Sequence, residues 1–387
     1  MRIVIAPDCF TGTLTAGEAA EAVASGWARS APHDELVCVP LSDGGPGFVD
    51  VLAASLGGQP LALTVSDPLG RPVPATVLVV EDAGTRTAYV ESAQACGLHL
   101  LAQAERDPRR TSTYGVGEMV LAAVEHGAGR IVVGLGGSGT NDAGAGLLAA
   151  LGVGSPERLA RGGLALDQVA RGDLAGLDAA TDRLRDVELV CATDVDTPLL
   201  GLQGASAIFG PQKGASPDQV QALEAALGHF ADVVRRTTPE ERDLVTGEAI
   251  RVDRRPGAGA AGGLGYGLML LGGHRVSGVE AILSAVRFPA LLADADLVVT
   301  GEGRFDWQSL RGKVVSGVAQ AASGHGIPVV VIAGQVAVGR REAMAVGANG
   351  VYAVAEKPEQ VPAALADPAG RLADRAERVA RTWSPTR

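Results

Sequence analysis

The chain has 387 residues, of which 53 are glycine and only 3% are aromatic. Glycine therefore occurs at about twice its usual share of roughly 7%, but the glycines cluster and keep no three-residue period, which excludes collagen. A hydrophobic content of 47% and a charged content of 20% exclude an intrinsically disordered chain. The length favours two globular domains.

The charge and the cysteines exclude further classes of protein. The net charge of −11 argues against a nucleic-acid-binding protein, because such proteins neutralise phosphates with lysine and arginine. The four cysteines lie far apart without a C-x-x-C pair, which disfavours a disulfide framework or a zinc knuckle. No apolar run reaches the roughly 20 residues of a membrane span, and the N-terminal apolar run is too short for a signal peptide. We therefore expect a cytoplasmic protein that binds neither nucleic acid nor membrane.

The beginning of the chain alternates between strand and helix signals. Residues 3–6 form a short β-rich run, and Thr15 and Glu18 have the spacing of a capping box that starts a helix. A second strand is predicted at 36–39, followed by the loop 42–47 and another helix. This order of elements predicts a parallel sheet.

From about Leu61 the pattern changes to strands of period two, separated by turn signals at 67–70 and 82–84, which predicts a β-meander. Helices are then predicted at 115–127 and 216–236, with a strand at 131–134.

Near Leu291 the first pattern returns. The predicted elements are strands at 296–300, 328–333 and 351–355 and helices at 313–322 and 371–383. We predict a two-domain α/β protein. A Rossmann-like parallel-sheet domain is formed by both chain ends, residues 1–75 and 288–387, and residues 76–287 form an inserted mixed α/β domain with glycine-rich loops.

Two glycine-rich segments match the dinucleotide-binding pattern G-x-G-x-x-G. They are Gly134–Gly139, directly after a predicted strand, and Gly257–Gly262. Backbone amides that no side chain shields suit phosphate binding. The same glycines also allow close packing of helix and strand, and in a glycine-rich chain the pattern alone has little specificity.

Acidic residues follow several predicted strands. Ligands of open α/β sheets bind outside the carboxyl ends of the strands. A single aspartate there is usually a cap or turn residue, but a series of them beside glycine loops suits magnesium-dependent phosphoryl transfer. The acids are Asp8, Asp43, Asp194, Asp196, Glu302 and Asp306, and the basic residues that could bind phosphate are Lys213, Arg304 and Lys313.

Motifs follow one another along nearly the whole chain in an order that resembles the class I glycerate kinases, which transfer the γ-phosphate of ATP to a hydroxyl of D-glycerate. They are Ile5–Leu14, Ser42–Gly47, Asp67–Arg71, Thr111–Gly117, Gly136–Gly146, Asp194–Leu199, Gly204–Ser206, Phe209–Ala215, Pro256–Gly265 and Thr300–Asp306. The resemblance implies two α/β domains, ATP with Mg²⁺, and a small hydroxy-acid substrate. It also implies 2-phosphoglycerate as the usual product, and we expect that the chain could form a homodimer.

On this resemblance we assign candidate roles. Asp194 would accept the hydroxyl proton, Lys213 would offset developing charge, and Asp8 is the third candidate catalytic residue. Asp196 and Asp43 are candidate magnesium ligands, and the division of roles among the aspartates stays open.

The remaining candidates bind the nucleotide or the acceptor. For the nucleotide they are Gly136, Gly137, Ser138, Gly139, Asn141, Gly257, Gly259, Gly262 and Gly263. For the acceptor they are Asp43, Gly44, Gly45, Arg71, Glu302, Arg304 and Asp306.

Two loops depart from the family pattern. Relatives usually carry Ser-Phe-Lys-Gly where this chain has Cys9-Phe-Thr11-Gly, and Asp-Gly-Gly-Glu-Gly-Thr where it has Asp-Gly-Gly-Pro46-Gly-Phe48. The first loop has lost a cation, the second an acid and a hydroxyl, and both fall in the predicted terminal domain.

Several interpretations of these departures stay open. The acceptor could have changed, another cation such as Arg71, Arg304 or Lys313 could compensate, or the chain could be a ligand-binding relative without turnover. The remaining alternative is a dinucleotide-dependent oxidoreductase. This interpretation rests on the two matches to G-x-G-x-x-G.

Overall fold

The computed structural model describes residues 1–10, 12–82, 84–240, 242, 247–310 and 312–384. Its contacts divide the chain into two compact units. Unit 1 consists of Met1–Asp43, Asp50–Gly57 and Ser277–Arg387, and unit 2 of Gly44–Val49 and Gly58–Val276. The chain is a mixed α/β protein, as predicted from the sequence. No helix among the described residues is long and apolar enough to cross a membrane.

Unit 1 is built on a parallel sheet with the strand order β13-β11-β9-β1-β2. Its strands are β1 (Arg2–Ile5), β2 (Glu35–Cys38), β9 (Leu297–Thr300), β11 (Val329–Ala333) and β13 (Gly350–Ala353). Strand β1 lies between β2 and β9. The chain runs from β1 to β2 in one direction across the sheet, and from β9 to β11 in the opposite direction. The switch point of the sheet, where ligands bind in open α/β folds, therefore lies between β1 and β9.

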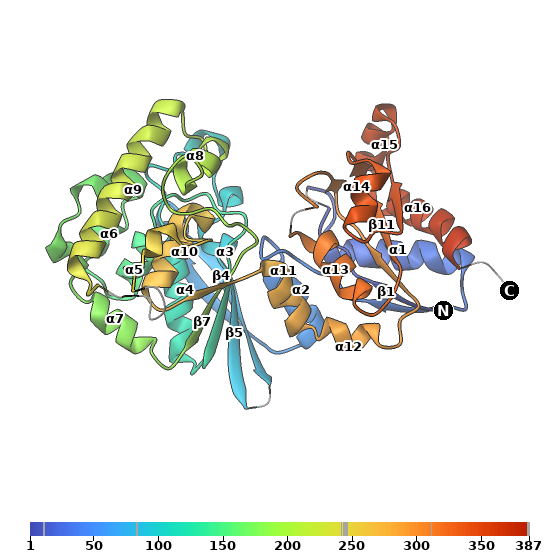
Figure 1. The fold of residues 1–387 in the computed structure, drawn as a ribbon, viewed down its shortest axis with the longest axis horizontal. Helices are drawn as coiled ribbons and strands as arrows, with labels where there is room; N and C mark the ends of the chain where they lie inside the picture. Colours follow the sequence, from blue (N-terminus) through green and yellow to red (C-terminus); the bar gives the residue numbers. More distant parts are fainter. Residues whose placement is uncertain (11, 83, 241, 243–246, 311, 385–387) are drawn as a thin grey trace. The chain divides into compact units, whose positions relative to one another are not determined.

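Helices cover both faces of this sheet. Helix α1 (Ala16–Ser30) begins at Thr15, whose side chain and Glu18 form the predicted capping box, and it packs beside α16 (Pro368–Trp383) (Figure 1). Both helices share a core with Val330 and Ile332 of β11, whereas Val331 and Ala333 share a core with Val315 and Ala343 of α13 and α14. Alternate residues of a strand point to opposite faces, so β11 is buried on both sides.

The other elements of unit 1 are short. They are α11 (Gly278–Ala285), α12 (Phe288–Leu292), β10 (Arg304–Phe305), α13 (Val314–Ser323), β12 (Gln335–Val336), α14 (Arg340–Ala345) and α15 (Val361–Ala366). Helix α2 (Phe48–Leu56) has its first residues in unit 2 and the others in unit 1.

Unit 2 is built on a sheet with the order β3-β4-β5-β6-β7-β8. Its strands are β3 (Gln59–Ser66), β4 (Pro72–Asp82), β5 (Thr85–Glu91), β6 (Arg130–Gly134), β7 (Glu188–Ala192) and β8 (His274–Val276). Strands β3 to β5 form the predicted antiparallel meander, and β5 to β8 are parallel.

The helices of unit 2 pack around this sheet (Figure 1). They are α3 (Ala93–Cys96), α4 (Tyr114–Glu125), α5 (Ala145–Ala150), α6 (Pro156–Leu159), α7 (Leu177–Arg183), α8 (Ala205–Phe209), α9 (Pro217–Thr237) and α10 (Ala260–Leu270). Because β3 pairs with β4 along its whole length, residues 58–75 group with unit 2, whereas the sequence places them with the chain ends. The domain limits near residues 75 and 288 stay a prediction.

Candidate functional site

Three carboxylates follow the strands around the switch point of unit 1. Asp8 follows β1, Glu302 follows β9, and Asp43 follows β2. The amide of Asp8 donates to the carbonyl of Gly301 at 2.8 Å, which extends the pairing of β1 with β9 into both loops. The predicted acids therefore gather where a parallel sheet places its ligands.

Burial and nearby negative charges raise the pKa values of Asp8 and Glu302. Burial and the negative charges of Asp43 and Glu302 raise the pKa of Asp8 to about 7, although the Cys9 amide donates to its Oδ1 at 2.7 Å. Burial, with Asp306 and Asp43 nearby, raises the pKa of Glu302 to about 7. A proton or a cation would therefore stabilise this group of acids.

The chemistry of these acids bears on whether they can hold a magnesium ion. Glu302 is 7% exposed, and its Oε1 is buried without a hydrogen-bond partner among the described residues. In the same part of the chain, no group of three or more His, Cys, Asp or Glu side chains could hold a metal ion by itself. Magnesium uses one or two carboxylates together with substrate phosphates, so the acids fit a magnesium ion that is held partly by its ligand.

Two further acceptor candidates lie close behind Glu302. Arg304 begins β10, and its Nε lies 3.7 Å from Oδ2 of Asp306. The other carboxyl oxygen of Asp306, Oδ1, accepts from the amide of Gln308 at 2.9 Å. The structure thus gathers Asp8, Asp43, Glu302, Arg304 and Asp306 in unit 1.

The glycine-rich loop after β6 lines a cavity of about 510 Å³ in unit 2, here called the lysine cavity. It is lined by Pro46, Leu98, His99, Arg106, Leu135, Gly136, Gly137, Ser138, Val195, Phe209, Gln212, Lys213 and Ala261. The predicted residues are Gly136, Gly137, Ser138 and Lys213, whereas sequence reasoning missed the side chains of Arg106 and His99. The segment that contains them has no glycine motif, so the basic side chains themselves were the only sequence signal for a place in the cavity. The volume suits a small ligand.

Lys213 is the buried cation of this cavity. Its side chain is 2% exposed, and its Nζ donates to Oγ of Ser138 at 2.9 Å and to the carbonyl of Thr140 at 2.7 Å. An ammonium has three donors, so the third has no acceptor among the described residues and can meet an anion. Burial lowers the pKa of Lys213 to about 8, although Cys96 and Asp142 oppose this shift.

Asp142 fixes the glycine loop from within. It is fully buried and accepts from the amide and Oγ1 of Thr113 at 2.8 and 3.0 Å and from the amide of Gly146 at 3.2 Å. Burial raises its pKa, which these hydrogen bonds counteract. Gly137 has a φ of +73°, and a Cβ there would lie 2.8 Å from Cγ of Pro46, so the loop needs glycine at this position.

The second glycine-rich segment packs against the first. Gly257, Gly259, Gly262 and Gly263 are all buried. A Cβ on Gly262 would lie 2.0 Å from the carbonyl oxygen of Thr140. These contacts demonstrate close packing, and phosphate binding by these glycines stays a prediction.

The oxidoreductase alternative required a strand before this second segment. The structure has a 3₁₀ turn there, Val252–Arg254, so the segment is not the loop of a dinucleotide-binding βαβ unit.

Other candidates line the same edge of the unit 2 sheet. Asp194 follows β7 and is half-buried, and Asp196 forms an ion pair with Arg275 at 2.9 Å. Asn141 is fully buried and donates to Oγ of Ser206 at 2.9 Å.

Three predicted glycines act here through their backbone. The amide of Gly136 donates to the carbonyl of Gly44 at 3.0 Å, and a Cβ on Gly136 would lie 2.4 Å from Cα of Gly45. The amide of Gly139 donates to the carbonyl of Cys96 at 2.7 Å.

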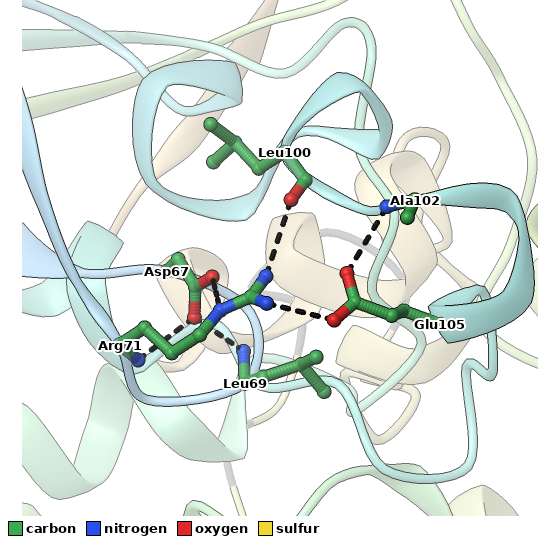
Figure 2. Close-up of polar contacts among 6 residues, drawn as sticks. All are labelled: Asp67, Leu69, Arg71, Leu100, Ala102 and Glu105. Carbon is green, nitrogen blue, oxygen red and sulfur yellow. Dashed lines mark hydrogen bonds and ion pairs between the residues drawn. The ribbon is translucent and has the colours of Figure 1, made fainter.

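Arg71 lies in a network of its own, which Figure 2 shows. Its Nε donates to Asp67, one terminal nitrogen donates to Glu105 at 2.8 Å, and the other donates to the carbonyl of Leu100 at 3.2 Å. We call these four residues the Arg71 clamp. It holds the segment 98–106, which supplies His99 and Arg106 to the lysine cavity.

The residues that depart from the family pattern have different surroundings. Thr11 lies outside the described residues. Pro46 lines the lysine cavity, and Phe48 is fully buried with its ring 6.1 Å from that of Tyr89. Residues 44–49 group with unit 2 and not with the chain ends, where the sequence places them.

Carboxylates at strand ends, a glycine-rich loop and a buried lysine are the features of an α/β phosphotransferase that acts on a hydroxyl group. The sequence model described as the glycerate kinase family matches residues 3–384. The chain belongs to the glycerate kinase family.

Individual relatives agree with this assignment. The chain is 42% identical over 387 residues to a glycerate kinase of Bacillus subtilis, covering 98% of this chain and 96% of the relative. It is 41% identical over 341 residues to a glycerate 2-kinase of Escherichia coli, covering 86% and 85%. A crystal structure assigned as a glycerate kinase 2 of Salmonella typhimurium LT2 has a TM-score of 0.79 at 38% identity, covering 99% of this chain and 98% of the other.

Proposed function

We propose that the protein transfers the γ-phosphate of ATP to a hydroxyl of D-glycerate, with 2-phosphoglycerate as the product. The observation that carries this proposal is the lysine cavity, where a buried ammonium with a spare donor lies beside a glycine loop and two further basic residues. Relatives named glycerate kinase and glycerate 2-kinase support the acceptor and the position of its hydroxyl.

The chemical step asks the protein mainly for positioning and compensation of charge. The acceptor hydroxyl oxygen bonds to the γ-phosphorus, the bond to the β–γ bridging oxygen breaks, and ADP leaves. In our proposal the carboxylate of Asp194 takes the hydroxyl proton. Lys213 offsets the charge on the phosphate oxygens, and the amide of Gly137 adds a neutral donor.

Magnesium, when bound, would neutralise phosphate charge. In unit 1 the carboxylates of Asp43, Asp8 and Glu302 are suited to hold it, because burial and neighbouring negative charges raise the pKa of Asp8 and of Glu302. Asp196, the other predicted ligand, already pairs with Arg275 at 2.9 Å, so we regard Asp43 as the better candidate.

An assay of ADP formation with D-glycerate tests the function directly. The product hydroxyl is identified by adding enolase alone, since enolase consumes 2-phosphoglycerate and not 3-phosphoglycerate. We expect ADP formation and consumption of the product. The absence of ADP formation with D-glycerate would contradict the proposal.

A changed acceptor is the second candidate function, because Pro46, which departs from the family pattern, lines the lysine cavity. A panel containing tartronate and larger hydroxy acids tests it. Faster turnover of another acid, together with a gain in glycerate activity for Thr11→Lys, would establish it. Tight ATP binding without turnover of any acid would instead identify a ligand-binding relative.

A further inference from the structure

Unit 2 contains another cavity, of about 470 Å³, which has four arginines and one acid in its lining. Arg109 and Arg110 come from the segment before α4, and Arg158 and Arg161 from α6 and the residues after it. The acid is Asp167. We call this the arginine cavity, and none of its lining residues lines the lysine cavity. Such a concentration of positive charge stands out in a chain with a net charge of −11.

The backbone holds the two segments of the arginine cavity together. The amide of Leu164 donates to the carbonyl of Arg109 at 3.1 Å. Gly162 has a φ of +91°, and a Cβ there would lie 2.4 Å from the carbonyl carbon of Arg110. The cavity wall is therefore preformed and does not depend on ion pairs between the arginines and acids.

The arginines differ in how far their charge is already neutralised. Arg109 donates to both carboxyl oxygens of Asp107, at 2.8 and 2.7 Å, and Nε of Arg158 lies 3.8 Å from Asp173. Arg110 and Arg161 are exposed and form no ion pair with any residue that the structure describes. At least these two guanidinium groups can bind an external anion.

We propose that the arginine cavity binds a small phosphate-bearing anion at a site separate from the lysine cavity. Guanidinium groups stay charged at all physiological pH values, and their planar donors match phosphate oxygens in pairs. The lining also includes the apolar side chains of Leu164, Ala165 and Val169, which suit a short carbon body attached to the phosphate. This inference does not depend on the proposed function.

The arginine cavity is joined to the glycine loop by a short stretch of chain. Thr111, next to Arg110, donates its Oγ1 to the carbonyl of Gly139 at 3.0 Å. A Cβ on Gly163 would lie 2.1 Å from the carbonyl oxygen of Asn141. The wall of the arginine cavity and the glycine loop that lines the lysine cavity are therefore in direct contact through these two segments.

Isothermal titration of the full chain tests the site, with inorganic pyrophosphate and 3-phosphoglycerate as separate probes. Tighter binding of pyrophosphate would identify phosphate alone as the recognised group, and tighter binding of 3-phosphoglycerate would add the carbon body. We expect Arg110→Gln with Arg161→Gln to weaken binding of the preferred probe at least tenfold. Lys213→Met, which alters the lysine cavity, should bind the preferred probe like the unaltered chain.

The matched control replaces two exposed arginines outside both cavities, Arg183→Gln with Arg236→Gln, and removes the same charge. It should bind the probe like the unaltered chain. The proposal is overturned if the control loses binding as much as Arg110→Gln with Arg161→Gln does, or if that double variant binds normally. It is also overturned if neither probe binds the unaltered chain with a dissociation constant below about 1 mM. Equal melting temperatures without probe show that the variants are folded.

Discussion

Lys213 is a buried amine whose pKa of about 8 lies within the range of an ordinary assay. Only its protonated form can offset phosphate charge. We therefore expect kcat/KM to fall as the pH rises through about 8, and Lys213→Met to lower kcat/KM by about 10²–10³-fold at neutral pH. Rates measured from about pH 6.5 to 9.5 test this. A flat profile would remove Lys213 from the mechanism.

The stability of the same variant separates an active role from a structural one. Because the folded pKa of Lys213 lies below its usual value of 10.5, its contribution to stability is fully present above 10.5 and is lost as the pH falls through about 8. At neutral pH the charged side chain is therefore buried at a penalty. We expect Lys213→Met to have this lowered kcat/KM without loss of melting temperature.

Asp194 follows β7 at the carboxyl edge of the unit 2 sheet. If it accepts the hydroxyl proton, Asp194→Asn should lower kcat by about 10²–10⁴-fold with little change in KM. Asp186→Asn, an exposed acid just before the same strand, is the control and should keep normal turnover. Near-normal turnover of Asp194→Asn would exclude it as the base.

At the scale of elements, the ends of β1 and β9 bring carboxyls together with raised pKa values. Such groups stabilise the fold below their unfolded pKa values of 3.8 and 4.5, and this contribution is lost as the pH rises through about 7. We expect the melting temperature to fall between about pH 5 and pH 8, and Mg²⁺ to raise it more at the higher pH.

A matched pair of variants tests whether these carboxyls cause the pH dependence of the melting temperature and the effect of Mg²⁺. Asp8→Asn should reduce both the pH dependence and the magnesium effect, because it removes one of the repelling charges. Glu359→Gln, an exposed acid in unit 1, should change neither. An unaltered magnesium effect in Asp8→Asn would show that the ion binds elsewhere.

The Arg71 clamp joins the turn after β3 to the segment that supplies His99 and Arg106 to the lysine cavity (Figure 2). Asp67, at 2% exposed, would lose its charged partner in Arg71→Ala. We expect a lower free energy of unfolding, because the buried carboxylate is left without this partner. We also expect a raised KM with a smaller change in kcat, and partial recovery in Arg71→Lys.

The control for the clamp is Arg86→Ala, since Arg86 forms a surface ion pair with Glu81 at 3.3 Å. Surface pairs contribute about 0–1 kcal/mol, so this variant should have normal KM and nearly normal stability. A loss of stability without a change in KM for Arg71→Ala would limit the clamp to a structural role.

Most elements could be predicted because their signals are local. The capping box that starts α1, the helix predicted at 216–236 and the period-two strands of the meander are confirmed. Strand β8, His274–Val276, was missed because three residues carry no periodicity. The kink at Ala261 in α10 was also missed, because its φ of +52° depends on packing against a loop far away in sequence.

Less of the candidate site could be predicted, since its partners are distant in sequence. The glycine motif and Lys213 were found, and both line the lysine cavity. Arg106 carries no motif, so its place in the lining required the fold. Arg71 was expected to bind the acceptor, whereas the clamp uses Nε and both terminal nitrogens of its guanidinium group.

At the scale of the whole molecule, the division into two units leads to a thermodynamic prediction. Each unit has its own sheet and buried core, so we expect two unfolding transitions in calorimetry. Magnesium should shift the transition of unit 1, and pyrophosphate that of unit 2. A single transition that shifts as a whole with either ligand would contradict independent units.

A homodimer stays a prediction, which sedimentation tests.

The position of β9 in the unit 1 sheet has a consequence for the synthesis of the protein. Strands β1 and β2 leave the ribosome early, but β9, which pairs with the other edge of β1, begins only at Leu297. At about 5–20 residues per second, the edge of β1 stays unpaired for on the order of 10 to 50 s. Unit 2 is completed during this interval. The length of the insertion thus sets how long that edge of β1 stays open to pairing with another chain.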